Sequence, residues 1–271
     1  MNDILELIQE QYKKDNFRIE YNDCKNGLAY IYCSSNALYK QDDPQSFTER
    51  VIIGDRYEWM NLRADSKPEL EIFIRDIWLS WYVKGINERI NSYEKLIDFM
   101  KYITCGYTVR CVGASSGGFI GTILAMDLSA EISYSFAGQF SLVNHFDHLQ
   151  SNPYLHEYSK RNDDKYIEYY KRLPDAEGEV LYLFPIQSEQ DQQQYNLVKD
   201  IKNVHTIKVQ SSEHGVAIYP FAVQKLLSYN AIDAEKLGGG GISSKLITSI
   251  RIAGWRKCIL WGINKVIMRL R

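Results

Sequence analysis

Residues 109–121 read Val-Arg-Cys-Val-Gly-Ala-Ser-Ser-Gly-Gly-Phe-Ile-Gly. An apolar run leads directly into the pattern G-x-S-x-G, with Ser115 at its centre. A strand that turns sharply into a helix can hold a serine hydroxyl at the top of a sheet, on a strained backbone that only small neighbours allow. Gly113 and Gly117 stand two residues either side of Ser115, where a Cβ would crowd such a turn. The stretch therefore predicts a strand, a turn that presents a serine, and a helix.

The five-residue pattern is weak evidence by itself. It arises by chance in roughly one chain in ten to twenty of this length, and its alternative interpretation is a glycine-rich turn with an idle serine. A catalytic serine of this kind needs a strand before it, a helix after it, and then an acid and a histidine in that chain order. The rest of the sequence has to supply that context.

Composition narrows the classes of protein that fit. The chain has 271 residues, a formal net charge of -2 and 45% apolar residues. These values suit one large α/β domain and argue against a dedicated nucleic-acid binder, which would be strongly basic. The cysteines are scattered, odd in number and without a C-x-x-C pair, so we expect a reducing, cytoplasmic setting with no disulfide framework and no metal site. They are Cys24, Cys33, Cys105, Cys111 and Cys258.

Strand-like and helix-like segments alternate along the chain. Strands are predicted over 28–33, 57–62, 71–74, 109–112, 132–136, 180–185 and 204–209, with an earlier strand-like run after residue 16. Helices are predicted over 1–15, 91–103, from the serine turn to about 127, over 197–201 and over 215–227, with a helical insertion over 144–176. This alternation predicts an α/β fold with a mainly parallel central sheet flanked by helices. Ligands of such sheets bind beyond the carboxyl ends of the strands.

The histidine and the acid are sought in the loops after the last strands. His214 lies in the loop after 204–209, which is where a general base for Ser115 would sit. His205 lies within that strand, and the other histidines, His145, His148 and His156, fall in the predicted insertion. The acid should follow 180–185, where Asp191 is preferred and Glu189 is the alternative. Asp191 could instead cap the next helix, and Glu213 is a third, less favourable acid.

A tetrahedral intermediate also needs hydrogen-bond donors for its oxyanion. One should be the backbone N–H of Ser116, the residue after the nucleophile. The second should come from the loop after the early strand 28–33, and is therefore assigned to Ser35 or Asn36.

The C-terminal segment differs in character from the rest. Four glycines, 238–241, predict a flexible linker after a catalytic domain spanning 1–237. Residues 242–271 contain seven lysines and arginines and no acid, interleaved with apolar residues. Cations interrupt every apolar run, so we expect a basic amphipathic helix on an anionic membrane surface rather than a transmembrane helix. The alternative is a helix that packs on the domain or on a partner subunit.

With these residues in place, residues 16–230 resemble the α/β-hydrolase superfamily. More narrowly, the G-A-S-S-G-G turn, the Ser-Ser loop after the early strand and the absence of a His-Gly-Gly motif resemble the α/β-hydrolase-fold O-acetyltransferases and esterases of bacterial capsule and surface-polysaccharide gene clusters. The resemblance implies a Ser-His-Asp triad, with Ser115 as nucleophile, His214 as base then acid, and Asp191 as the residue that orients the histidine. It implies acetyl-CoA as co-substrate and no bound cofactor.

The expected function is therefore transfer of an acetyl group from acetyl-CoA to a hydroxyl of a capsular polysaccharide or lipid-linked glycan, on the inner face of the cell membrane. One alternative is an esterase with the same triad, in which water replaces the sugar. A second is a scaffold of a polysaccharide assembly complex that has no catalytic activity. The sequence leaves the oligomeric state open.

Overall fold

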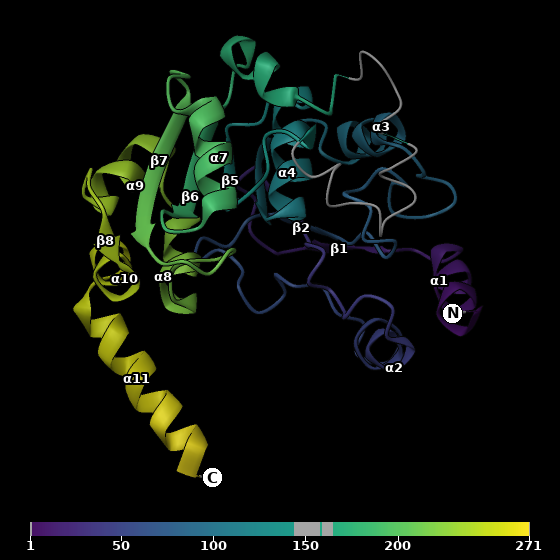
Figure 1. Cartoon of the computed structure of the whole chain (residues 1–271), viewed down its shortest axis with the longest axis horizontal. Helices are drawn as coiled ribbons and strands as arrows, with labels where there is room; N and C mark the ends of the chain where they lie inside the picture. Colours follow the sequence, from purple (N-terminus) through teal and green to yellow (C-terminus); the bar gives the residue numbers. More distant parts are fainter. Residues whose placement is uncertain (1, 144–157, 159–164, 271) are drawn as a thin grey trace.

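A computed structural model describes residues 2–143, 158 and 165–270. Eight strands form one sheet in the order β1-β3-β2-β4-β5-β6-β7-β8 (Figure 1). The strands are β1 (Phe17–Tyr21), β2 (Leu28–Cys33), β3 (Leu70–Ile74), β4 (Thr108–Ala114), β5 (Ile132–Phe136), β6 (Glu179–Pro185), β7 (Val204–Gln210) and β8 (Ser243–Ser244). Only β1 runs antiparallel to its neighbour, β3. The predicted mainly parallel sheet is confirmed, and with the serine turn after the central β4 it has the α/β-hydrolase fold.

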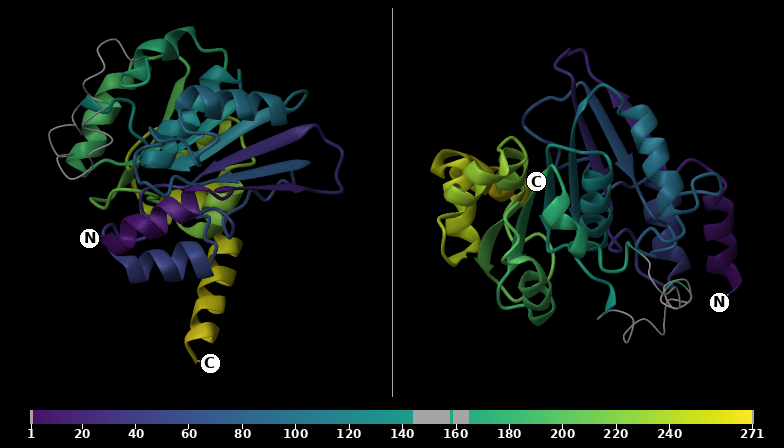
Figure 2. Two further views of the ribbon diagram at one scale, coloured as in Figure 1. Left: turned by 90° about the vertical axis from the view of Figure 1, so that its right-hand side faces the viewer. Right: turned by 90° about the horizontal axis from the view of Figure 1, so that it is seen from above.

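Helices cover both faces of the sheet (Figure 2). The α-helices are α1 (Asn2–Tyr12), α2 (Pro44–Phe47), α3 (Tyr93–Ile103), α4 (Ser116–Asp127), α7 (Glu189–Val198), α8 (Pro220–Leu226), α9 (Ala231–Gly238), α10 (Lys245–Ala253) and α11 (Trp255–Leu270). A π-helix, η1 (Thr48–Ile53), and a 3-10 helix, η3 (Tyr169–Asp175), complete the described elements. Most of the predicted insertion over 144–176 lies outside the described residues.

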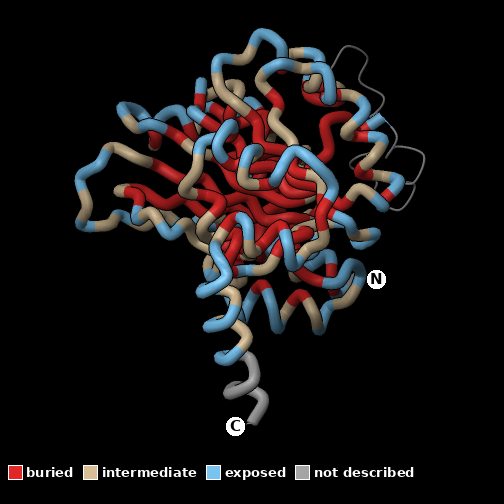
Figure 3. Tube along the Cα trace, turned by 90° about the vertical axis from the view of Figure 1, so that its left-hand side faces the viewer, coloured by how far each residue is buried: buried red, intermediate tan, exposed pale blue. Residues whose placement is uncertain are grey.

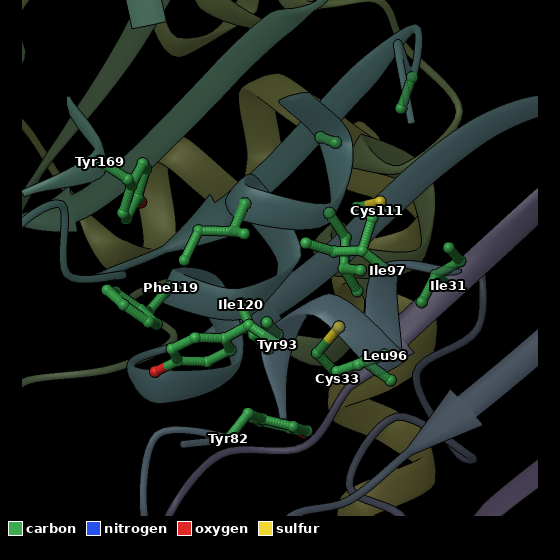
Figure 4. Close-up of a cluster of buried hydrophobic side chains, with 14 of the residues drawn as sticks. Ile31, Cys33, Tyr82, Tyr93, Leu96, Ile97, Cys111, Phe119, Ile120 and Tyr169 are labelled. Atoms are coloured by element: carbon green, nitrogen blue, oxygen red, sulfur yellow. The ribbon is translucent and has the colours of Figure 1, made fainter. Parts of the chain in front are cut away.

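Alternating side chains of the strands divide the core into two layers. On β2, Ile31 and Cys33 join α3, α4 and α7 in one cluster, whereas Tyr30 and Tyr32 join α8, α9 and α10 in the other. Figure 4 shows the first cluster, in which the Cys33 and Cys111 thiols lie among apolar side chains. Burial raises the pKa of both thiols, so they stay protonated and act as small hydrophobes. The buried residues concentrate around the sheet (Figure 3).

The predicted strand over 57–62 is wrong. These residues form turns that lie across the carboxyl ends of the strands. The indole Nε1 of Trp59 donates to the Cys33 carbonyl oxygen at 2.9 Å, and its ring packs against Phe136 with centroids 5.5 Å apart. The aromatic, alternating pattern of this segment therefore serves packing at the end of β2 and β5 rather than strand pairing.

The C-terminal segment also differs from the sequence prediction. Gly238 ends α9, and the left-handed φ values of Gly239 and Gly240, 88° and 63°, make a tight turn instead of an open linker. Ser243–Ser244 then forms β8 beside β7, and α10 packs on α8 and α9. A break at Gly254, with a φ of 83°, separates α10 from α11. The body of the protein thus extends to 253, and the single helix predicted over 242–271 is two helices.

Within the described part of the chain, the structure contains no helix that combines the length and the apolar character needed to cross a membrane.

Candidate active site

Ser115 sits in a strained turn between β4 and α4. Its φ and ψ are 51° and −123°, a region that costs a residue with a side chain about 1–3 kcal/mol. A Cβ on Gly113 would lie 2.0 Å from the Gly117 carbonyl oxygen, and one on Gly117 would lie 2.3 Å from the Cys33 carbonyl oxygen. Only glycine therefore fits on either side of Ser115, which is the physical reason for the G-x-S-x-G pattern.

The structure brings together His214, from the loop after β7, and Asp191, from the helix that follows β6. The Nδ1 atom of His214 lies 2.9 Å from Asp191 Oδ1 and 3.1 Å from Oδ2. Asp191 is fully buried, and the side chain of His214 is 32% exposed. This contact fixes the ring of His214 and leaves its other nitrogen for a reacting hydroxyl.

Asp191 belongs to the first turn of α7, which begins earlier than the sequence indicates. The Ser188 hydroxyl caps this helix by accepting from the Asp191 N–H, so Asp191 does not act as the cap. The N-terminal end of a helix favours a negative charge, which supports a buried carboxylate at this position.

The alternative residues lie elsewhere. Glu189 and Glu213 are both exposed. His205 is paired on β7 with Glu235, 3.1 Å from its Nδ1 atom, away from the serine turn. His145, His148 and His156 lie outside the described residues.

A pocket of about 500 Å³ joins the serine turn to the histidine loop. Its walls are formed by Ser35, Asn36, Ala37, Arg56, Glu58, Trp59, Leu62, Ala114, Ser115, His214, Gly215 and Val216. A volume of this order accommodates a small organic ligand. Among the described residues, no group of three or more His, Cys, Asp or Glu side chains converges to hold a metal ion.

Gln139 contacts the candidate nucleophile and was not singled out from the sequence. Its side-chain Nε2 donates to Ser115 Oγ at 3.3 Å, while its Oε1 accepts from the indole Nε1 of Trp81 at 3.3 Å. Gln139 is fully buried, so the two contacts fix which end of its amide faces the serine. Gln139 is a polar residue in the loop after β5, three positions beyond the end of the strand, and this place at the same sheet edge as Ser115 is the signal that the sequence carries.

Trp81 is held in place by the loop that follows β3. The Asp76 carboxylate accepts hydrogen bonds from the N–H groups of Trp78, Ser80 and Tyr82. Burial raises the pKa of Asp76, and these hydrogen bonds oppose that rise. The loop carries Trp81 at a φ of 53°, a left-handed conformation that the carboxylate contacts stabilise.

The first predicted oxyanion donor is the backbone N–H of Ser116. The N–H of Ser116 occupies the first position of α4, where no carbonyl of the same helix can accept it. The side chain of Ser116 is held by two hydrogen bonds: its Oγ donates to Asn36 Oδ1 at 3.0 Å and accepts from the Asn36 N–H at 2.9 Å. Asn36, the alternative second donor, therefore has its N–H engaged.

The second predicted donor, Ser35, already donates its hydrogen bonds to a carboxylate. Its N–H donates to Glu58 Oε2 at 2.6 Å, and its hydroxyl donates to Glu58 Oε1 at 3.1 Å. Arg56 lies beside this carboxylate, with its Nη2 atom 3.9 Å from Oε1. Neither Glu58 nor Arg56 was identified from the sequence, because they fall at and before the start of a segment interpreted as a strand.

A buried arginine fixes the segment that carries Glu58. Arg75 Nη1 donates to the Arg56 carbonyl oxygen at 3.1 Å and lies 3.0 Å from Asp55 Oδ1. Its guanidinium also stacks over the Tyr57 ring, 4.5 Å from the centroid. Glu58 is thereby held at the position from which it contacts Ser35.

We expect Glu58→Gln to raise kcat/KM for p-nitrophenyl acetate about tenfold, because a fixed negative charge at a donor position opposes a developing oxyanion. Glutamine keeps the length of the side chain and can still accept from the Ser35 N–H. Initial rates of ester cleavage measure the effect, with the exposed Glu49→Gln as control. A lower rate in Glu58→Gln would contradict the prediction and identify Glu58 as a support of the Ser35 loop.

No protein-family model and no curated protein matches this chain. Solved structures with similar folds include the capsule O-acetyltransferase of Neisseria meningitidis serogroup A, at 11% identity and a TM-score of 0.47, covering 73% of this chain and 85% of that chain. MenH from S. aureus matches at 9% identity and a TM-score of 0.42, covering 81% and 97% of the two chains. A carboxylesterase structure from Nitrososphaera gargenis matches at 11% identity and a TM-score of 0.43, covering 73% and 87%. At these values the similarities carry no information on the reaction.

Proposed function

We propose that this protein is a serine acyltransferase that moves an acetyl group from acetyl-CoA to a hydroxyl of a bacterial surface polysaccharide. The observation that supports an acyl-transfer site is the placement of Ser115 and His214 on one pocket, with Asp191 2.9 Å behind the histidine. The choice of acetyl-CoA and of a polysaccharide rests on the resemblance of the serine turn and the Ser-Ser loop to capsule O-acetyltransferases.

In the proposed reaction, Ser115 Oγ attacks the thioester carbonyl while His214 takes the hydroxyl proton. The tetrahedral intermediate places its oxyanion at the Ser116 N–H and then collapses, and the thiolate of CoA leaves with the proton from His214. A sugar hydroxyl next attacks the acetyl-serine, and its proton passes through His214 to Ser115 Oγ as the acetyl ester of the sugar forms. Trp59, Leu62 and Val216 give the pocket apolar walls that limit access of water to the acetyl-serine.

An esterase is the second candidate, and the exposure of His214 favours it. A side chain that is 32% exposed gives water a route to the base beside an acyl-serine. Water would then take the place of the sugar hydroxyl in the second half of the reaction.

Incubation with acetyl-CoA carrying a labelled acetyl group separates the two candidates. We expect an acetyl group on the peptide that contains Ser115 and, when O-acetyl-free capsular polysaccharide is added, label on the glycan. Mass spectrometry of the peptide and radioactivity of the glycan are the two measurements, with Ser115→Ala as the blank. Acetate released from an O-acetylated glycan, without any labelling from acetyl-CoA, would instead establish an esterase.

Acetyl-CoA is a cytoplasmic metabolite, so the proposed reaction belongs on the inner face of the cell membrane. A lipid-linked or nascent glycan would present its hydroxyls there.

A further inference from the structure

The last helix of the described chain, α11, extends away from the α/β body (Figures 1 and 2). One of its sides is anchored at its base. The Trp261 ring packs against the rings of Tyr219 and Phe221, with centroids 5.0 and 5.6 Å apart, and Lys257 forms an ion pair with Asp65. Cys258, on the same side, is partly buried against the core. The helix is therefore attached along the side that carries 257, 258 and 261.

The other side of α11 presents large apolar side chains to solvent. Trp255, Ile259 and Ile263 follow one another at intervals of four residues, so they lie on one face of the helix. They are 60%, 51% and 50% exposed, and the adjoining Leu260 is 61% exposed. A continuous face of this kind on a projecting helix indicates an interaction surface, whereas single exposed apolar residues do not.

The distribution of charge identifies the partner. Residues 242–271 carry seven lysines and arginines and no acid, although the whole chain has 32 basic and 34 acidic residues. The body, which extends to 253, includes two of these seven, Lys245 and Arg251, and therefore has 27 basic and 34 acidic residues, an excess of seven acids. An anionic surface would attract the C-terminal segment and repel the body, which orients the molecule with α11 toward that surface.

A second copy of this chain fits the apolar face poorly. Two copies paired through α11 would bring together the five cations of residues 255–271 from each copy, ten in all, with no acid from either segment to pair with them. An anionic lipid bilayer supplies both partners, because its acyl chains take up the apolar side chains and its headgroups carry the negative charge.

We propose that α11 binds the surface of an anionic lipid bilayer, with Ile259, Leu260 and Ile263 inserted below the headgroups and Trp255 at the depth of the headgroups. An indole suits the depth of the headgroups, and the positive charge of the segment is attracted to the lipid phosphates. This inference rests on α11 alone and does not depend on the reaction at Ser115.

Vesicle flotation of the full chain tests the proposal. We expect the protein to float with vesicles made of equal parts of phosphatidylglycerol and phosphatidylcholine, and to float far less with phosphatidylcholine alone or at high salt. The double variant Ile259→Gln, Ile263→Gln should reduce the floated fraction by about tenfold or more, because two exposed apolar side chains no longer insert. These residues are on the surface, so the substitutions leave the core intact.

Tyr102→Gln is the matched control, since Tyr102 is a large, 85% exposed side chain on α3 and should not affect flotation when replaced. Equal flotation of the full chain and the double variant would overturn the proposal. So would a dimer, seen by light scattering, that the double variant dissociates while neither protein floats, because that result would assign the apolar face to a second copy.

Discussion

Replacing Ser115 with alanine is expected to lower kcat for cleavage of p-nitrophenyl acetate by about 10⁴–10⁶-fold. The reason is that the proposed reaction passes through an acyl-serine, and the hydroxyl of Ser35, the other serine among the described residues that line the pocket, donates to Glu58. The Ser116 hydroxyl is engaged with Asn36 through two hydrogen bonds and is fully buried. Alanine keeps the Cβ, so the turn retains the φ of 51° that the glycines around it permit.

The control for this experiment is Ser212→Ala. Ser212 is an exposed serine in the loop before His214, and its replacement should leave the rate unchanged. Circular dichroism and thermal melting of both variants establish that the fold is retained. An Ser115→Ala protein that keeps its rate, or that keeps its role in polysaccharide assembly when it replaces the parent protein in cells, would favour the scaffold without catalytic activity.

The sheet and the serine turn could be predicted because each is specified locally. Val109 to Val112 lie in one mostly buried strand, and the backbone around Ser115 leaves no space for a side chain at Gly113 or Gly117. Ser115, Asp191 and His214 follow β4, β6 and β7, and these three strands occur in the same order along the chain and across the sheet. His214 and Asp191 are brought together by β6 and β7 lying side by side.

The parts that escaped prediction depend on contacts between residues far apart in sequence. Glu58 reaches the Ser35 N–H only because Arg75, on the loop end of β3, holds the intervening segment. Gln139 faces Ser115 because Trp81 fixes the other end of its amide. Neither of these long-range contacts can be recognised from the local composition of the chain. The segment 57–62 was also misinterpreted, because an aromatic segment that packs over the edge of a sheet has the same alternation of apolar and polar residues as a strand. The glycine run after Leu237 likewise has the composition of a linker, while its conformation is a turn.

The role of Asp191 leads to the second large effect. In Asp191→Asn we expect kcat/KM for p-nitrophenyl acetate to fall by about 10⁴-fold, with little change in the structure around the pocket. In the proposed triad, the carboxylate accepts a hydrogen bond from the Nδ1–H group of His214, and the other ring nitrogen is then the one that takes the proton of Ser115. An asparagine amide can donate to Nδ1 instead, which places the ring proton on the other nitrogen, so that the proposed base can no longer accept a proton.

The matched control is Glu189→Gln. Glu189 is an exposed acid in the same first turn of α7, and the substitution makes the same change from a carboxylate to a carboxamide. We expect its rate to equal that of the parent protein, because the Glu189 side chain lies outside the buried contact with His214. The comparison decides between the two acids that the sequence left open: a large loss in Glu189→Gln together with an active Asp191→Asn would transfer the role to Glu189. Asp191 is fully buried, so thermal melting of Asp191→Asn must accompany the kinetics. A loss of rate at an unchanged melting temperature assigns the effect to the orientation of the histidine, because a general loosening of α7 would lower both.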